Sequence, residues 1–224
     1  MTKCIFLILV IFFLCTLELA GQETAYGPGY QTVLINNPAF SGSESDGTLR
    51  LSYLNFYPGR NFNLNSFYVS YDTYMPVIHG GAGFFVTDDY LGGIINDIRG
   101  GFSYAYHFQA NKNVFINAGL SASCYYRSFN NGKIVLPDQI DPLNGVTNPQ
   151  GELLAERGIA AFDIGTGIMI MSGRFFGGLA LNHLTSPNLS GQGFQTDRIE
   201  RKLTLNLAGR FDLNKNLNIF IFFS

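Results

Sequence analysis

The sequence predicts an all-β fold, an antiparallel transmembrane β-barrel of the outer-membrane type, on three observations. Residues 201–213 alternate between apolar and polar side chains, which describes a strand with one apolar and one wet face. Similar strands recur in a chain that begins like an exported protein. Past residue 21 no apolar run reaches the ~18 residues of a membrane helix, so a closed barrel is the spanning structure that remains.

The N-terminus has the three parts of a secretory signal peptide. Lys3 precedes an apolar run over residues 4–17, and small residues follow it. This run is shorter than the roughly 20 residues that cross a bilayer, which argues against a transmembrane anchor. We therefore expect residues 1–21 to be a cleaved signal peptide and residues 22–224 to form one barrel domain in the outer membrane.

Composition fits strands and excludes several classes of function. The chain has 21 Phe, 12 Tyr and 26 Gly, which suit pleated sheets and tight turns better than helices. Only 13% of residues are charged and the net charge is -2, so a nucleic-acid partner is not expected. Cys124 is the single cysteine past the signal, which excludes an intrachain disulfide in the mature chain.

Nine strands, two short turns and two long connections follow the N-terminal segment. The strands are predicted at 47–57, 63–75, 80–88, 94–108, 113–127, 159–171, 174–184, 200–213 and 216–223. Asn and Gly in the turns at 111–113 and 171–174 tolerate positive φ. Barrels of this type place long loops outside the cell, so the connections 128–158 and 185–199 are candidate extracellular recognition segments.

The predicted strands carry one apolar face and one small or polar face. Phe102, Tyr104, Tyr106 and Phe108 alternate with Ser103, Ala105 and His107, for example. A soluble β-sandwich would show the same alternation with its apolar face in a core. Strand length favours the barrel, because membrane strands need about 9–11 residues whereas globular strands average about 5–6.

No catalytic or metal-binding arrangement is predicted, so the protein is expected to be non-enzymatic and to need no cofactor. His79, His107 and His183 are far apart and lack metal-ligand spacing, and Cys124 lies on an apolar face where a thiol is inert. The acidic stretch over residues 88–93, which is followed by Asn96-Asp97, is interpreted as a solvated hairpin turn, with calcium binding as the alternative. Four charged residues are interpreted as interior side chains able to pair inside the barrel: Asp163, Lys202, Arg210 and Asp212.

A short motif precedes the first strand, within an N-terminal segment of residues 22–46. It reads Ile35-Asn36-Asn37-Pro38-Ala39-Phe40-Ser41-Gly42 and resembles the start of the PorP/SprF family of type IX secretion system outer-membrane proteins of Bacteroidetes. Pro38 restricts the backbone and Gly42 allows a sharp reversal, so the segment is expected to plug or cap the barrel mouth. The resemblance assigns family-motif residues at Asn37, Pro38, Ala39, Phe40, Gly42, His183 and Pro187.

The resemblance continues through most of the mature chain. It includes Gly81-Ala82-Gly83, Asn117-Ala118-Gly119-Leu120 and Asp163-Ile164-Gly165-Thr166-Gly167. At Tyr53-Leu54-Asn55-Phe56-Tyr57 the chain departs from the family's Tyr-Arg-x-x-Trp and lacks both the Arg and the Trp. Family members are typically longer, and bacterial barrels close with an even number of strands. We therefore expect either a further strand within 128–158 or, by preference, a C-terminally truncated family member.

The resemblance implies a non-enzymatic function in protein secretion. The partners would be outer-membrane lipid, type IX secretion components and a secreted surface protein, such as an adhesin or a gliding-related protein that the barrel helps to secrete or anchor. Two other functions stay open at this point. A general porin or small-molecule channel shares the predicted fold, and a soluble periplasmic β-sandwich binding protein shares the strand alternation.

Overall fold

The computed structural model describes residues 29, 31–44, 46–56, 64–130, 140–141, 145–146, 158–190, 197–214 and 217–223. For residues 140–141, 145–146, 210–214 and 217–223 it describes the backbone alone. The expected signal peptide, residues 1–21, lies outside these ranges. None of the helices in the described ranges is long and apolar enough to cross a membrane.

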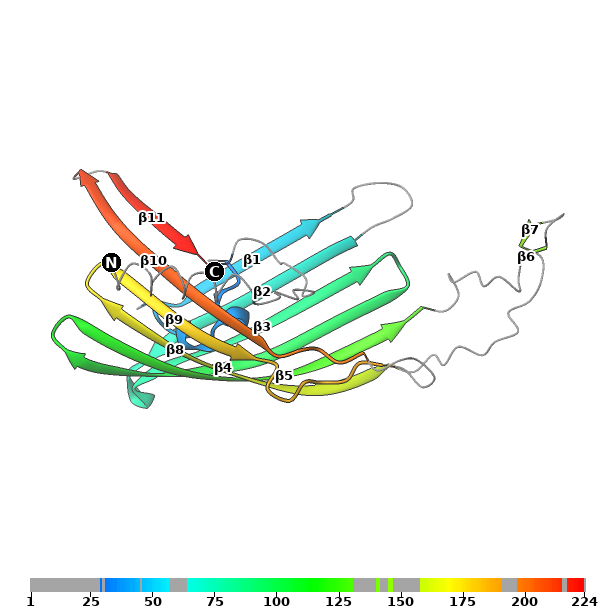
Figure 1. Cartoon of the computed structure of the whole chain (residues 1–224), viewed down its shortest axis with the longest axis horizontal. Helices are drawn as coiled ribbons and strands as arrows, with labels where there is room; N and C mark the ends of the chain where they lie inside the picture. Colours follow the sequence, from blue (N-terminus) through cyan, green and yellow to red (C-terminus); the bar gives the residue numbers. More distant parts are fainter. Residues whose placement is uncertain are drawn as a thin grey trace, which may run out of the picture.

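Nine strands form one antiparallel sheet in the order β1-β2-β3-β4-β5-β8-β9-β10-β11 (Figure 1). They are β1 (Thr48–Asn55), β2 (Leu64–Met75), β3 (Gly80–Leu91), β4 (Ile95–Asn111), β5 (Val114–Phe129), β8 (Ile159–Ser172), β9 (Phe175–Asn182), β10 (Lys202–Asn214) and β11 (Leu217–Phe223). Each predicted strand is confirmed, and no end differs from its prediction by more than three residues. Within the connection 128–158, β6 (Ile140–Asp141) and β7 (Gly145–Val146) pair in a separate two-stranded sheet.

The faces of the nine-stranded sheet are the reverse of those in a soluble protein. On β10 the outward Leu203 is 72% exposed and Leu205 54%, whereas Thr204 and Asn206 face inward and are buried. On β4 the outward side chains Phe102, Tyr104, Tyr106 and Phe108 are exposed in the same way. An apolar belt of this extent is stable against lipid and not against water. The sheet is therefore that of a membrane β-barrel, and the β-sandwich alternative does not fit it.

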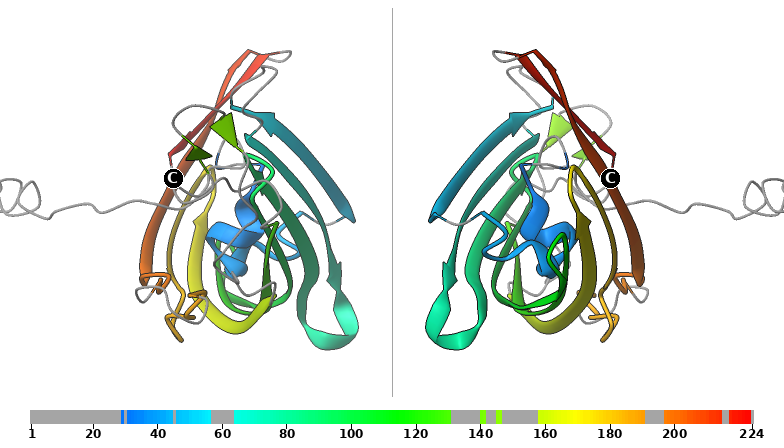
Figure 2. Two further views of the ribbon diagram at one scale, coloured as in Figure 1. Left: turned by 90° about the vertical axis from the view of Figure 1, so that its right-hand side faces the viewer. Right: turned by 90° about the vertical axis from the view of Figure 1, so that its left-hand side faces the viewer.

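The sheet curls into a half-barrel around the N-terminal segment (Figure 2). Two short helices of that segment, α2 (Val33–Asn36) and η1 (Pro38–Phe40), lie inside the curve. The main buried apolar cluster lies between these helices and the inner wall, and it contains Val33, Leu34, Ile35, Ala39, Phe40, Tyr68, Phe85 and Met169. The curled sheet thus has its apolar core around the segment that it encloses.

The predicted hairpin turn over residues 88–93 is present only at its end, because Asp88 and Asp89 are not part of it. Both residues belong to β3, where they pair with Ile98 and Asp97 of β4. The turn lies beyond them at Gly92 and Gly93, whose φ values of 61° and 78° suit glycine. Strand alternation places Asp89 on the buried inner face and leaves Asp88 exposed.

Candidate functional site

The N-terminal segment over residues 31–44, here called the plug, folds by local rules. Asn37 follows α2 and its side chain accepts a hydrogen bond of 2.9 Å from the backbone N–H of Ala39, which caps η1. Pro38 is the first residue of η1, a position whose backbone N–H has no partner within the helix, so that the N–H that proline lacks is not needed there. Gly42, with φ of 63°, reverses the chain toward β1. The predicted reversal at Gly42 is thus present in the structure.

Apolar side chains of the plug are buried against the inner wall. Leu34 and Ala39 are fully buried, and Phe40 packs edge-on against Phe176 of β9 with ring centroids 5.6 Å apart. Met169 of β8 joins the same cluster. Full burial of a Leu or Phe side chain stabilises a fold by about 1.5–3 kcal/mol, so this packing fixes the plug firmly.

Four wall glycines, here called the glycine seat, let the plug backbone approach the sheet. They are Gly81 on β3, Gly119 on β5, Gly167 on β8 and Gly178 on β9. A Cβ at Gly81 would overlap the backbone of Ser41 and Gly42, and one at Gly119 would overlap Pro38 and Ala39. At Gly167 and Gly178 a Cβ would meet the Asn37 side chain. The seat therefore fits the Asn-Pro-Ala motif and leaves no room for a larger residue.

Strand register explains why these glycines meet. Gly81 pairs with Ala105, Ala105 with Gly119, and Gly119 with Gly167, so small residues follow one transverse row of the sheet. The short motifs that carried the family resemblance, although far apart in sequence, thus converge beneath the plug.

Asparagine side chains tie the plug to three strands. Asn37, fully buried, donates to the side-chain oxygen of Asn206 on β10 over 3.2 Å. Asn117 of β5 donates to the carbonyl of Ala39 over 3.3 Å, and Asn182 of β9 donates to the carbonyl of Asn36 over 2.9 Å. Buried bonds of this kind fix position because losing one partner leaves the other desolvated and unpaired.

The C-terminal end of the plug is tied to β2 and β4. The hydroxyl of Ser41 bonds to that of Ser103 over 2.7 Å, and the Ser41 carbonyl lies 2.9 Å from Nε2 of His107. Asp72, which is buried, accepts from the backbone N–H of Gly42 over 2.8 Å. Together with the asparagines, these bonds connect the plug to strands from β2 to β10.

Asp72 also pairs with Arg50, a residue that the sequence interpretation missed. The Arg50 guanidinium bonds to Asp72 and, over 3.2 Å, to Glu44 of the plug. The departure from the family's Tyr-Arg-x-x-Trp drew attention to residues 53–57, whereas this cation of the first strand lies three residues earlier. Arg50 lies between Leu49 and Leu51, which face outward, and this alternation is the sequence signal that would have placed Arg50 on the inner face.

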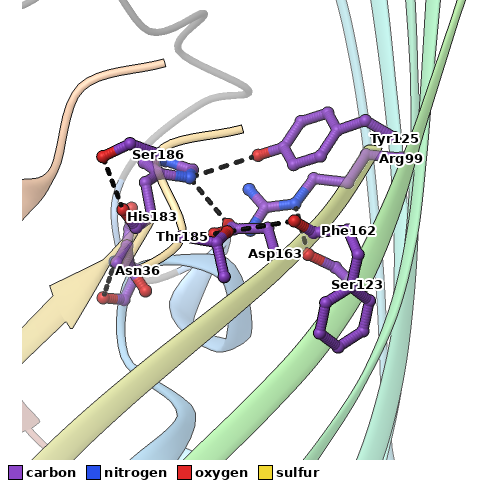
Figure 3. A network of polar contacts seen from close by, with 10 residues as sticks. Asn36, Arg99, Ser123, Tyr125, Phe162, Asp163, His183, Thr185 and Ser186 are labelled. Atoms are coloured by element: carbon purple, nitrogen blue, oxygen red, sulfur yellow. Dashed lines mark hydrogen bonds and ion pairs between the residues drawn. The ribbon is translucent and has the colours of Figure 1, made fainter. Parts of the chain in front are cut away.

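A buried charge network lies on the inner wall beside the plug (Figure 3). Asp163 of β8 accepts from Nδ1 of His183 over 2.8 Å, from Thr185 over 3.0 Å and from Arg99 of β4 over 3.5 Å. Arg99 also donates to Ser123 of β5 over 3.2 Å. Arg99, Asp163 and His183 are each no more than 5% exposed. A buried carboxylate with three partners of this kind is stable because its charge is compensated.

Aromatic rings complete the surroundings of Arg99. Its guanidinium carbon lies 4.7 Å from the ring centre of Tyr125 and 5.3 Å from that of Phe85, which are cation–π distances. His183, with φ of 59°, and Thr185 begin the connection between β9 and β10. The network thus pins the start of this long connection to the barrel wall.

The residues predicted from the sequence are the family-motif residues and the charged interior candidates. Asn37, Pro38, Ala39, Phe40 and Gly42 are all buried in the plug, and His183 and Pro187 are buried in the connection after β9. Of the interior candidates, Asp163 belongs to the charge network, and Nζ of Lys202 lies 3.4 Å from the side-chain oxygen of Asn36. The side chains of Arg210 and Asp212 lie outside the described part of the chain.

Histidine and cysteine side chains are dispersed. His79 lies in the turn after η2 (Pro76–Ile78), His107 stacks on Tyr74, and His183 is in the charge network. Cys124 is exposed on the outer face. Among the described residues, no three His, Cys, Asp or Glu side chains are grouped so that they could hold a metal ion. The arrangement of the site is that of a packed plug.

Comparison with known proteins identifies the family. Residues 19–224 match the model of the family described as type IX secretion system membrane protein PorP/SprF. Searches of curated proteins and of solved structures found no match. The family match spans nearly the whole sequence, including the plug and the nine strands that surround it. The chain therefore belongs to the PorP/SprF family of type IX secretion system membrane proteins.

Proposed function

We propose that the protein is a plugged barrel of the outer membrane that helps type IX secretion to export or anchor surface proteins, such as adhesins or gliding-related proteins. The observation that carries this proposal is the plug itself. A segment seated on four glycines and bonded to strands from β2 to β10 fills the interior that a solute channel needs open. The barrel then serves as a membrane-fixed platform for protein partners.

The outer-membrane location rests on the sheet and on the export signal. The apolar belt requires lipid, and residues 1–21 have the pattern of a cleaved signal peptide. The short turns after β4 and β8 then face the periplasm, and the long connections after β5 and β9 face the exterior. The proposed partners are outer-membrane lipid, type IX secretion components and the exported surface protein.

A porin function is less compatible with the interior. Val33, Leu34, Ile35 and Phe40 bury apolar surface where a water-filled lumen would require polar side chains. Solutes could pass only if the plug moved away from the glycine seat, where its backbone packs closely against the wall. The porin alternative therefore predicts a mobile plug, and the secretion alternative predicts a fixed one.

A pull-down from outer membranes tests the secretion function. The tagged full-length protein is cross-linked in the native cell, solubilised in detergent and purified, with an unrelated tagged outer-membrane barrel as the control. We expect type IX secretion components and a surface protein to be enriched with this protein and not with the control. Equal recovery with both baits, or recovery of the protein from the periplasm as a soluble monomer, would refute the proposal.

A further inference from the structure

A groove of about 990 Å³ runs along the outer face of β8, β9 and β10. Its lining on the lipid side is apolar and mostly aliphatic, with Ile168, Ile170, Phe175, Leu179, Leu203, Leu205 and Leu207. A volume of this size lies at the upper end of ligand sites, which span about 300–1,000 Å³. The outer face is therefore hollowed at this place.

Gly177 lies within the hollow and deepens it. In the sheet register Gly177 of β9 stands between Ile170 of β8 and Leu207 of β10. Phe175 and Leu179 flank it along its own strand, since side chains two residues apart share a face. A Cβ built at Gly177 would reach Leu207 at 3.4 Å, which is ordinary contact. The missing side chain thus leaves a gap that is walled on four sides by apolar groups.

A cation, Arg201, lies two residues before the groove-lining Leu203 in the sequence. Arg201 immediately precedes β10, whose outward Leu203 and Leu205 line the groove, while Lys202 faces inward. Arg201 is exposed and lies on the side of the long connections, which face the exterior in the proposed orientation. An apolar groove with an exposed guanidinium just beyond Leu203 in the sequence matches the chemistry of acyl chains joined to a phosphate.

We propose that this groove binds lipid A of the outer leaflet, with acyl chains packed over Gly177 and a phosphate on Arg201. We choose a lipid of the outer leaflet because Arg201 lies on the exterior side of the sheet in the proposed orientation. Burial of methylene groups in the groove supplies affinity, and the ion pair selects the phosphorylated headgroup. This inference rests on the outer-membrane location that we propose and not on the identity of any protein partner.

Native mass spectrometry of the full chain extracted from outer membranes tests the site. Gly177→Leu places a side chain inside the groove, and Gly100→Leu is the matched control because a Cβ at Gly100, also on the outer side of the sheet, meets no atom within 4 Å. We expect lipid A to remain bound to the wild type and to Gly100→Leu. The amount of lipid A bound to Gly177→Leu should be roughly tenfold lower. Heat-modifiable migration confirms that each variant is folded.

Arg201→Glu tests the headgroup contact with lipid A and with dephosphorylated lipid A as probes. The wild type should retain the phosphorylated form on the order of tenfold better, and the variant should not distinguish the two. Equal retention by wild type and Gly177→Leu, or retention of phospholipid alone, would overturn the proposal. A wild-type protein that carries no lipid A but gives the expected pull-down refutes the groove alone, whereas a failed pull-down from wild-type protein that retains lipid A refutes the secretion role alone.

Discussion

Single residues of this protein act chiefly by joining the plug to the wall. Asn37 caps η1, bonds to Asn206 and fills the space left by Gly167 and Gly178. On the wall, Asp163 pairs with Arg99 and binds His183, so that its negative charge compensates the charge of Arg99. Each of these side chains is buried with several partners, so its removal affects more than one contact.

Asn37→Ala should destabilise the folded barrel by about 2–4 kcal/mol, because two buried hydrogen bonds and their packing are lost. Denaturant unfolding in detergent micelles measures the change. Asn36→Ala is the matched control, since the Asn36 side chain is only partly buried and bonds to Thr32 over 3.1 Å and, more weakly, to Lys202. A loss for Asn37→Ala no greater than that for Asn36→Ala would contradict the role given to Asn37.

Asp163→Asn should cost about 3–5 kcal/mol, because it removes a compensating negative charge from the buried Arg99 and His183. The same substitution at the exposed Asp88 should change the free energy of unfolding by less than about 0.5 kcal/mol. Limited proteolysis of the connection after β9 provides a second readout, because His183 and Thr185 lose the carboxylate that pins them. Unchanged cleavage and unchanged stability would show that the network is not needed.

At the scale of elements, the strands follow directly from their alternating pattern. β10 is confirmed because Leu203, Leu205 and Leu207 recur every second residue, and the same rule gave β4, β5 and β8. The end of β3 was predicted wrongly because Asp88 and Asp89 are turn-forming residue types, whereas the register with β4 carries the strand on to Leu91. At these two residues, pairing with β4 outweighs the turn propensity of aspartate.

The site was predictable in part. The Asn37-Pro38-Ala39-Phe40 motif and Gly42 indicated a plug, whereas no contact with the plug was predicted for the wall glycines beneath it. That Gly81, Gly119 and Gly167 share one row depends on the register of four strands, which local pattern does not fix. Arg99 and its three-way contact with Asp163 and Ser123 depend on the same long-range register.

At the scale of the whole molecule, an apolar outer belt surrounds a polar wall with an apolar plug inside it. Outward side chains such as Phe102 and Leu203 are exposed, and inward ones such as Ser103 and Asn206 are buried and bond to the plug. The plug therefore supplies the apolar core that the wall of a membrane barrel lacks. The stability of the plug and that of the wall then depend on the same set of contacts.

The outer belt predicts how the barrel responds to a charge on its lipid face. Leu205→Lys should destabilise the inserted barrel by about 2–4 kcal/mol, since the cation lies against hydrocarbon. Gln109→Lys, at an exposed position near the end of β4, is the control and should have little effect. Unfolding from lipid vesicles measures both, and equal stability of the two variants would argue against a lipid-facing β10.

Planar-bilayer recording of purified full-length protein tests the central claim that the plug closes the barrel. Gly119→Val places a side chain where Pro38 and Ala39 contact the wall, while Gly100→Val adds the same group in open space. We predict no steady conductance for the wild type and for Gly100→Val, and a steady solute-permeable conductance for Gly119→Val. A wild-type protein that conducts steadily, at the level of Gly119→Val, would contradict the account.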